Sequence, residues 1–468
     1  MSPITCSGPR KIVCLLVAAL LPVGAVWAEP KPLTKEEQAR IDDAINRAVT
    51  FLKEAQTERG SWKWGMYRDG RFHAAQSAMP AYALLESGVP ADDPVIGKAA
   101  DFIRPKIKES DYTYELSLAL LFYERRGDKG DKALIQTLAA RLLAGQHYTG
   151  GWSYRCPILD ERAERDLLTT LRQLGKVMKD NGLTREQALG KVEVPQELRN
   201  LPVFRASSAL LWREPAGTRE AILDAANRAS LDGRTDNSNT QFAMLGLWAA
   251  QRHGTPVEPS FELMVTRFES SHSSDGAWWY ALDEDGGTRA MTCVGLMGLA
   301  IGRGLKLPTA GNVGAKKDIH VLRGLAALSN RVGKPAYRMD RTVPFHDLYF
   351  LWSVERVAML YDLPSIGEKD WYRWGAESLV TNQTKAGWWG GASPTPEWFG
   401  RRNYDYKATL STSFALLFLK RAHPMKDLTP KLPLTGKELN EGIATLRPED
   451  KYPVRVAQPA TPSRNRQP

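Results

Sequence analysis

Carboxylates, amides and aromatic side chains gather at the starts of several apolar segments of this chain of 468 residues. The richest stretch, "TDNSNTQ", places Asp236, Asn239 and Gln241 ahead of an apolar run. Asp and Asn at a helix start commonly cap exposed N–H groups and favour the helix dipole. Asn239 and Gln241 fall inside the first turns, however, where buried amides need partners. The stretch is therefore a candidate ligand site, and helix capping is the structural alternative.

Three later apolar segments carry similar groups at their starts: an aromatic pair with an acidic turn, a His-Asp pair and a Tyr-Asp pair. Aromatic rings beside carboxylates suit a sugar, and an acid/base pair facing across a cavity would suit glycoside cleavage. Adjacent His and Asp on a helix do not face each other, so a catalytic His would need another partner, and a structural His is the alternative. The full set of candidate ligand-binding residues is Asp236, Asn239, Gln241, Trp279, Tyr280, Asp283, Asp285, His346, Asp347, Tyr404 and Asp405.

Only two residues, Cys293 and His346, are candidate zinc ligands on consecutive apolar segments. Two ligands do not make a zinc site, and Cys293 fits a small buried apolar position. Cys156 and Cys293 could form one disulfide in an oxidising compartment. We predict no metal and no cofactor.

A repeated turn is expected to position these groups. The pattern Gln-x-x-x-Gly-x-Trp occurs three times, and a fourth copy has His272 in place of the Gln. The Gly permits a turn with positive φ, and the Trp buries a large surface while keeping one N–H donor. The Gln amide can satisfy orphan backbone groups at a helix terminus. We predict that the turns clamp successive repeats through Gln56, Gly60, Trp62, Gln146, Gly150, Trp152, Gly276, Trp278, Gln383, Gly387 and Trp389.

The segments between the turns have the patterns of helices. Some are apolar nearly all round, such as residues 237–251, and several end at a Gly such as Gly88 or Gly127. Amphipathic stretches alternate with them, which an inner and an outer ring of helices would produce. No segment shows sustained alternation with period two, so little sheet is expected.

The turn resembles the QW motif of squalene and oxidosqualene cyclases. The alternation of helices is similar to the α/α toroid that these enzymes share with protein prenyltransferase β subunits, over roughly residues 36–425. The resemblance implies an all-α fold, an α/α toroid with a double ring of six or seven helical hairpins. It also implies that the Gln ties down a neighbouring helix end. In such a ring the inner helices run in one direction, so their N-terminal ends surround one mouth of the central cavity.

The catalytic motifs of this superfamily are not matched. The acidic turn "LDEDGGTR" fits neither the Asp-x-Asp-Asp acid of squalene-hopene cyclases nor the Asp-Cys-Thr-Ala motif of oxidosqualene cyclases. Met291 stands two residues before Cys293, where zinc prenyltransferases carry an Asp. The Gly-Cys-Gly-Glu-Gln signature of toroidal thioester domains is also absent. The resemblance therefore implies the fold and leaves the chemistry open.

Composition and charge set the domain boundaries. Residues 1–28 have the basic start, short apolar run and small residues of a signal peptide, which predicts a secreted or periplasmic protein with no stable membrane span after its removal. Residues 29–425 form the toroid, with a polar helical insertion at about 157–200 that overlies the ring. Residues 426–468 are rich in Pro and charge and are expected to be disordered.

The net charge of +10 includes no dense basic run, so nucleic acid is not an expected partner.

Two functions follow from this pattern. The first is a binding or interaction module that holds an unknown small molecule, an isoprenoid or a glycan, at the mouth of the central cavity. The second is an enzyme, either an atypical terpenoid cyclase or a carbohydrate-active lyase or hydrolase. A deep aromatic pocket with one buried Asp favours isoprenoid chemistry, an open groove with paired carboxylates favours glycans, and a filled centre favours a scaffold.

Overall fold

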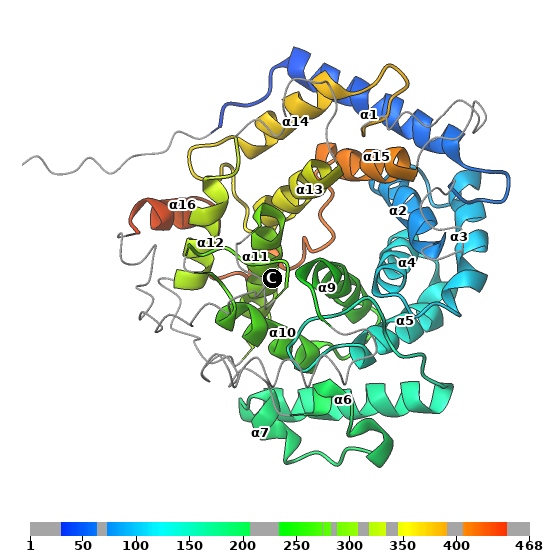
Figure 1. Ribbon diagram of the computed structural model, residues 1–468, viewed down its shortest axis with the longest axis vertical. Coiled ribbons are helices and arrows are strands. Elements are labelled where there is room, and N and C mark those ends of the chain that lie inside the picture. The colour runs from blue at the N-terminus through cyan, green and yellow to red at the C-terminus, as the bar shows by residue number, and fades with distance from the viewer. Residues whose placement is uncertain are drawn as a thin grey trace, which may run out of the picture.

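The computed structural model describes residues 30–62, 73–205, 234–273, 275–281, 288–307, 318–333, 345–390 and 406–446. Among these residues every regular element is a helix, and the only β-type pairs are isolated bridges. The helices form two concentric rings (Figure 1). The inner ring consists of α2 (His73–Glu86), α4 (Thr113–Arg126), α9 (Asn237–Gln251), α11 (Arg289–Gly304), α13 (Phe345–Leu360) and α15 (Tyr406–Leu419). The outer ring consists of α1 (Lys35–Ala55), α3 (Pro94–Ile107), α5 (Lys132–Ala144), α10 (Glu258–Ser270), α12 (Ile319–Ser329) and α14 (Trp371–Asn382).

The inner ring closes on itself, because α15 packs against α2 as well as against α13. The predicted α/α toroid is thereby confirmed, with six outer–inner pairs in the described chain. A seventh hairpin is not tested, because residues 206–233 lie outside the described residues. The burial pattern explains the two rings: residues 239–250 of α9 are all buried, whereas α1 buries only one face.

Three of the repeated turns join one outer helix to another through the Gln side chain. Gln56 Nε2 donates to the carbonyl of Val95 in α3 at 2.8 Å, and Gln146 Nε2 donates to that of Ser260 in α10 at 2.9 Å. Gln383 Nε2 reaches Ala44 of α1 at 2.8 Å and so ties the last outer helix to the first. The Gln was expected to satisfy an orphan group at a helix end. Its acceptor lies in the first turn of the neighbouring helix in two copies, at Val95 and Ser260, and in the middle of α1 in the third. In two copies the Gln therefore ties down a helix start, although the carbonyl it bonds is not one of the orphan groups at a helix C-terminus.

The Trp side chain satisfies an orphan carbonyl at the end of the preceding helix. The indole Nε1 of Trp62 donates to the Leu52 carbonyl at 2.7 Å, in the last turn of the helix that precedes the turn. The last four carbonyls of a helix have no partner within it, and the indole satisfies one of them. The same bond is made by the other three Trp residues of the repeat, to Leu142, Phe268 and Leu379.

The Gly of each turn is required both by its backbone and by its surroundings. Gly150 has φ +83°, and a Cβ on it would lie 2.3 Å from the carbonyl oxygen of Leu263 in α10. Gly60, Gly276 and Gly387 have similar φ values and similarly close helix carbonyls. The clamp therefore depends on direct contact between the turn and a helix backbone.

The chain after α15 folds across the C-terminal ends of the inner helices (Figure 1). We call residues 420–435 the strap; it inserts Met425 and Leu428, both fully buried, and contains η6 (Thr429–Lys431). It leads into α16 (Gly436–Ala444), which packs on α12 through a face that buries Leu439 and Ile443. Residues 426–446 are therefore folded, contrary to the expected disordered tail, because their widely spaced apolar side chains find partners on the ring. Residues 447–468 lie outside the described residues.

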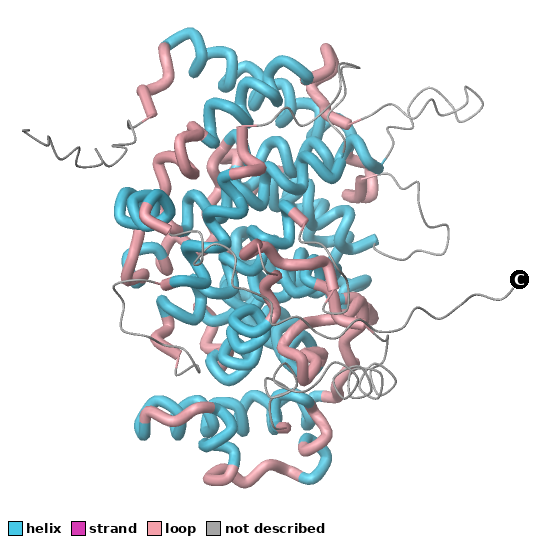
Figure 2. Tube along the Cα trace, turned by 60° about the vertical axis from the view of Figure 1, so that its left-hand side comes forward, coloured by secondary structure: helices cyan, strands magenta, loops and turns pink. Residues whose placement is uncertain are grey.

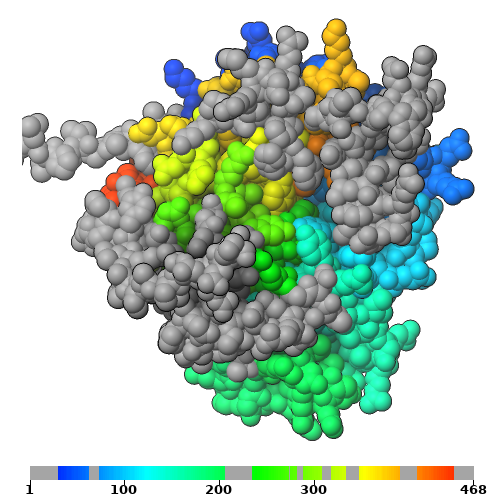
Figure 3. Space-filling view, in the orientation of Figure 1, coloured from blue at the N-terminus to red at the C-terminus, as the bar shows by residue number. Residues whose placement is uncertain are grey.

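The predicted insertion is helical but lies outside the outer ring and does not cover it. It contains α6 (Glu161–Asn181), α7 (Arg185–Leu189), η2 (Gln196–Leu198) and η3 (Pro202–Phe204), and α6 packs against α5 and α10. Figures 2 and 3 show it as a lobe on one edge of the molecule.

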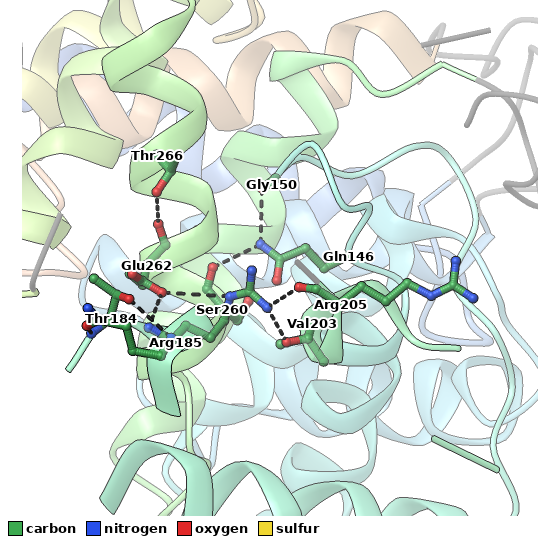
Figure 4. A network of polar contacts seen from close by, with 10 residues as sticks. Gln146, Gly150, Thr184, Arg185, Val203, Arg205, Ser260, Glu262 and Thr266 are labelled. Atoms are coloured by element: carbon green, nitrogen blue, oxygen red, sulfur yellow. Dashed lines mark hydrogen bonds and ion pairs between the residues drawn. The ribbon is translucent and has the colours of Figure 1, made fainter. Parts of the chain in front are cut away.

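Buried Arg185 fixes the insertion to the ring (Figure 4). It donates to the carbonyls of Val203 and Arg205 at 2.7 and 2.6 Å, and its backbone N–H donates to Glu262 of α10 at 3.0 Å.

Among the described residues no helix is long and apolar enough to cross a membrane.

Candidate functional site

The N-terminal ends of the inner helices and the repeated turns meet at one face of the ring, which we call the mouth. Trp152 pairs with Asp236, and Asp236 pairs with Ala281, in two isolated bridges. The backbone N–H of Asn237 donates to the Tyr280 carbonyl at 2.7 Å, and that of Thr113 donates to the Tyr154 carbonyl at 2.8 Å. The turns therefore hold the starts of the inner helices in place.

Asp236 caps α9, as the structural alternative expects. Its Oδ1 accepts the backbone N–H of Asn239 at 2.7 Å, and its Oδ2 accepts the Asn239 side-chain amide at the same distance. The residue is only 4% exposed. Burial raises the pKa of this carboxyl, while the bonds from Asn239 and the charge of Arg267 oppose the rise. Both oxygens are therefore engaged in holding the helix start.

Gln241 finds its partners inside the ring. The hydroxyl of Tyr349 donates to its side-chain oxygen, and its Nε2 donates to Ser353 Oγ at 3.3 Å. Tyr349 and Ser353 both lie on α13, which is separated from α9 by α11 in the inner ring. Gln241 thus links two inner helices across the interior, where the sequence left open whether a ligand or the fold would satisfy it.

Four tyrosines surround the starts of α4, α9 and α13, and we call them the mouth tyrosines: Tyr114, Tyr154, Tyr280 and Tyr349. The Tyr114 hydroxyl lies 2.6 Å from Ser238 Oγ, and the hydroxyls of Tyr154 and Tyr280 lie 3.4 Å apart. The rings of Tyr114 and Tyr154 are 6.0 Å apart. Tyr154 is 40% exposed and the other three are partly buried.

The hydroxyls of Tyr114, Tyr280 and Tyr349 remain protonated at neutral pH. Burial raises the pKa of Tyr114, Tyr280 and Tyr349 above the usual value, and the nearby charge of Asp236 raises all three further. Tyr280 was predicted from the sequence as a site residue. Tyr114, Tyr154 and Tyr349 were missed, because they lie on three separate segments and share no local pattern.

An aromatic cluster fills the interior beneath the mouth. The ring of Phe242 on α9 lies 5.4 Å from Trp352 on α13 and 5.1 Å from Tyr114 on α4. Trp352 lies 5.1 Å from Phe414 on α15. Phe242, Trp352 and Phe414 are buried. These separations are typical of packed aromatic pairs, so at this level the side chains of α4, α9, α13 and α15 meet each other.

The other carboxylates of the described mouth are engaged by neighbouring groups. Asp347 is buried and forms an ion pair with Arg289 of α11. Asp111 pairs with Arg155 at 2.8 Å. Glu115 accepts the Ser110 hydroxyl and the backbone N–H of Ala74. The described mouth therefore presents no two carboxylates facing each other in the manner of a glycosidase.

Several predicted residues fall where the structure gives no side-chain geometry. Asp283, Asp285, Tyr404 and Asp405 lie outside the described residues, and His346 belongs to α13 with its side chain outside the description. Trp279 is partly buried, and its indole Nε1 has no hydrogen-bond partner in the described part of the chain. Its backbone carbonyl accepts the Asn237 side-chain amide at 2.7 Å.

Neither cysteine of the described chain forms a disulfide. Cys156 and Cys293 are buried, and burial raises the pKa of the Cys156 thiol to about 12 and that of Cys293 further. Both are unreactive thiols of the interior. Among the described residues no group of three or more His, Cys, Asp or Glu side chains is placed to hold a metal ion.

A groove of about 880 Å³ lies at the opposite face, between the N-terminal segment and the ends of α13 and α15. Lys31, Lys35 and Arg421 line it, together with Asp362 and Asp370. Most of these side chains are exposed and their charges are mixed. The groove contains none of the residues predicted for the site.

No family model matches this sequence, and no curated protein matches it. Solved structures that resemble it include two complexes of the type II terpene cyclase MstE from Scytonema. The complex with geranylgeranyl dihydroxybenzoate has 13% identity and a TM-score of 0.30 over 86% of this chain and 100% of that chain. The complex with merosterolic acid A has 14% identity and a TM-score of 0.30 over 84% of this chain and 100% of that chain. Values this low assign no activity to the chain.

Proposed function

We propose that this chain is a binding module that holds a small molecule at the mouth of its helical ring, against the mouth tyrosines. One observation carries the proposal: four phenols from separate segments converge there, beside a buried aromatic cluster. The described mouth carboxylates are each engaged by a helix start, a hydroxyl or an arginine. The mouth therefore offers aromatic surface and hydroxyl groups and no acid/base pair among its described residues.

The ligand class that we favour is an isoprenoid with a polar end. The aromatic rings of Tyr114 and Tyr154 would pack against its hydrocarbon above the filled interior, and the hydroxyls of Tyr154 and Tyr280 would bond the polar end. A glycan would favour an open groove with paired carboxylates, which the described mouth lacks. The resemblance of the repeated turns to those of squalene cyclases supports the same class.

Titration with farnesol and with maltotetraose, followed by intrinsic tryptophan fluorescence, tests the proposal. We expect saturable binding of farnesol, weakened roughly fivefold or more in the double variant Tyr154→Phe/Tyr280→Phe, because both hydroxyls assigned to the polar end are lost. Tyr361→Phe is the matched control, since this buried phenol donates to Leu296 at the other end of α13. Saturable binding of maltotetraose alone would favour the glycan. Binding of neither compound would overturn the proposal.

Cyclisation of a polyprenyl chain is a second candidate function. The observation that favours it is Asp236, a buried carboxyl with a raised pKa close to aromatic rings, which is the environment that alkene protonation needs. Its two oxygens bond Asn239, so it would have to release one of these bonds to act as an acid. Incubation with polyprenyl substrates and mass spectrometry of the products tests this candidate. Products that persist in Asp236→Asn would exclude Asp236 as the acid.

Export to the periplasm or the exterior is a separate proposal. It is supported by the basic start, the short apolar run and the small residues that end at Ala28. Intact mass measurement of the protein recovered from cell fractions tests it. We expect a mature chain that begins near Glu29 in the periplasmic or secreted fraction, and a full-length chain in the cytoplasm would contradict the proposal.

A further inference from the structure

A second polar site lies at the floor of the ring, the face covered by the strap. Glu355 and Arg356 are adjacent residues near the end of α13, and both are 0% exposed. Arg356 Nη1 donates to Glu355 Oε2 at 3.0 Å and also to the Ala422 carbonyl of the strap. The guanidinium lies 4.7 Å from the ring centre of Trp352. Both hydrogen bonds of the guanidinium therefore come from the same nitrogen, Nη1.

The other edge of the Arg356 guanidinium has no partner. Its Nε and Nη2 are buried and make no hydrogen bond in the described part of the chain. Three other polar atoms are also buried without a hydrogen-bond partner in the described part of the chain: Glu355 Oε1, Trp352 Nε1 and the Tyr82 hydroxyl. Tyr82 lies on α2, and the charge of Arg356 is close enough to oppose the rise of its pKa that burial and Glu86 cause. Buried donors of this kind are costly unless a partner satisfies them.

Neighbouring carboxylates do not fill this edge, because each has another arginine. Glu86 pairs with Arg125 at 3.1 Å. Glu124 and Asp427 both pair with Arg252, at 2.9 and 2.7 Å. His423 on the strap adds no charge at neutral pH, since burial lowers its pKa to about 4. The unpartnered atoms around Arg356 are therefore mainly donors.

We propose that the Nε/Nη2 edge of Arg356 binds a carboxylate at the floor of the ring, with the Tyr82 hydroxyl as a further donor. The two N–H groups of this edge form a planar fork that matches the two oxygens of a carboxylate. Trp352 would lie beside the ligand and connect this site to the aromatic cluster. Burial raises the pKa of Glu355 to about 8, so at neutral pH this neighbour is largely protonated and does not repel the anion. The proposal does not depend on what binds at the mouth.

Calorimetric titration of the full chain with sodium acetate and with sodium decanoate, at constant ionic strength, tests the proposal. We expect saturable binding and a rise in melting temperature. If decanoate binds more tightly than acetate, the ligand is a carboxylate on an apolar body. If acetate binds as tightly as decanoate, the ligand is a small free carboxylate. An equal response to sodium chloride would overturn the assignment of a planar carboxylate. No saturable response to either carboxylate would indicate that water fills the site, and would overturn the proposal.

Three variants and one control sharpen the test. Arg356→Lys keeps the charge but loses the fork, so acetate should bind roughly tenfold or more weakly. Tyr82→Phe should bind a few-fold more weakly, and it keeps the test open if Arg356→Lys does not fold. Glu355→Gln removes a carboxyl beside the anion and should bind at least as tightly above pH 8. Arg421 is an exposed residue of the strap, so the control variant Arg421→Lys should bind acetate with unchanged affinity. Unchanged affinity in both Arg356→Lys and Tyr82→Phe would contradict the site.

Discussion

The mouth and the floor of the ring both carry many polar side chains, but the helix backbones use them differently. At the mouth, helix N-termini expose N–H groups, and Asp236 is used as an acceptor that caps α9. At the floor, the strap carbonyls need donors, and Arg252 and Arg356 bond those of Pro424 and Ala422. Polar side chains at the helix ends therefore first satisfy the backbone groups there. The groups left for ligands are the hydroxyls at the mouth and one guanidinium edge at the floor.

The largest loss of stability is expected in the repeated turn that contains Gly150. Gly150→Ala should lower the free energy of unfolding by about 3 kcal/mol, because the backbone has positive φ and a Cβ would overlap the Leu263 carbonyl. Gly182→Ala is the matched control, since its φ is +60° and nothing lies within 4 Å of its Cβ position; we expect about 1 kcal/mol there. Urea unfolding measures both. Equal losses would show that the turn is not a close-packed clamp.

The floor should show the next largest effect, as a dependence on pH. The pKa of Glu355 rises from 4.5 to about 8 on folding, so the folded state holds more protons between these values. Stability should therefore fall as pH rises from about 4.5 to about 8. Glu355→Gln should flatten this part of the profile measured by urea unfolding. An unchanged slope would mean that this carboxyl is ionised in the folded ring.

Removal of the cap at the mouth should have a smaller effect. Asp236→Ala should cost about 1–2 kcal/mol, because α9 loses an acceptor at its first turn. Asp236→Asn should cost less, since the amide oxygen still accepts the Asn239 N–H. Thermal unfolding measures stability, and fluorescence titration with farnesol measures binding. If Asp236→Asn loses farnesol binding while its stability is unchanged, Asp236 contacts the ligand. The helix caps and the ligand-binding hydroxyls would then not be separate groups.

The smallest change in stability is expected at the mouth tyrosines. Tyr154→Phe should alter the free energy of unfolding by less than about 0.5 kcal/mol, because the hydroxyl is exposed and its bond to Tyr280 is long. Its effect on farnesol affinity should be larger than its effect on stability. A loss of stability without any loss of affinity would assign this hydroxyl to the fold.

The sequence predicted the helical rings correctly because their signals are local. Apolar segments bounded by capping residues and Gly indicate helices wherever the partners lie, and Gly127 ends α4 with φ +75° as expected. Folding after residue 425 was not predicted, because Met425, Leu428, Leu439 and Ile443 are spaced among Pro and charged residues. Only contact with the ring shows that these side chains are core.

The candidate site was predicted in part. Asp236, Asn239, Gln241, Trp279, Tyr280 and Asp347 do lie at or just below the mouth. The partners that decide their roles come from distant segments: Tyr349 for Gln241, Arg289 for Asp347 and Ser238 for Tyr114. No spacing within the sequence indicates these pairs.

The two kinds of helix and the repeated turn can be predicted from the residues alone, since periodicity and turn chemistry act over a few neighbouring residues. The groups that each turn bonds, and the edge of Arg356 that has no partner in the described part of the chain, depend on how distant segments meet. The physical reason is that satisfaction of a buried polar atom depends on which distant group reaches it. Closure of the ring fixes that proximity.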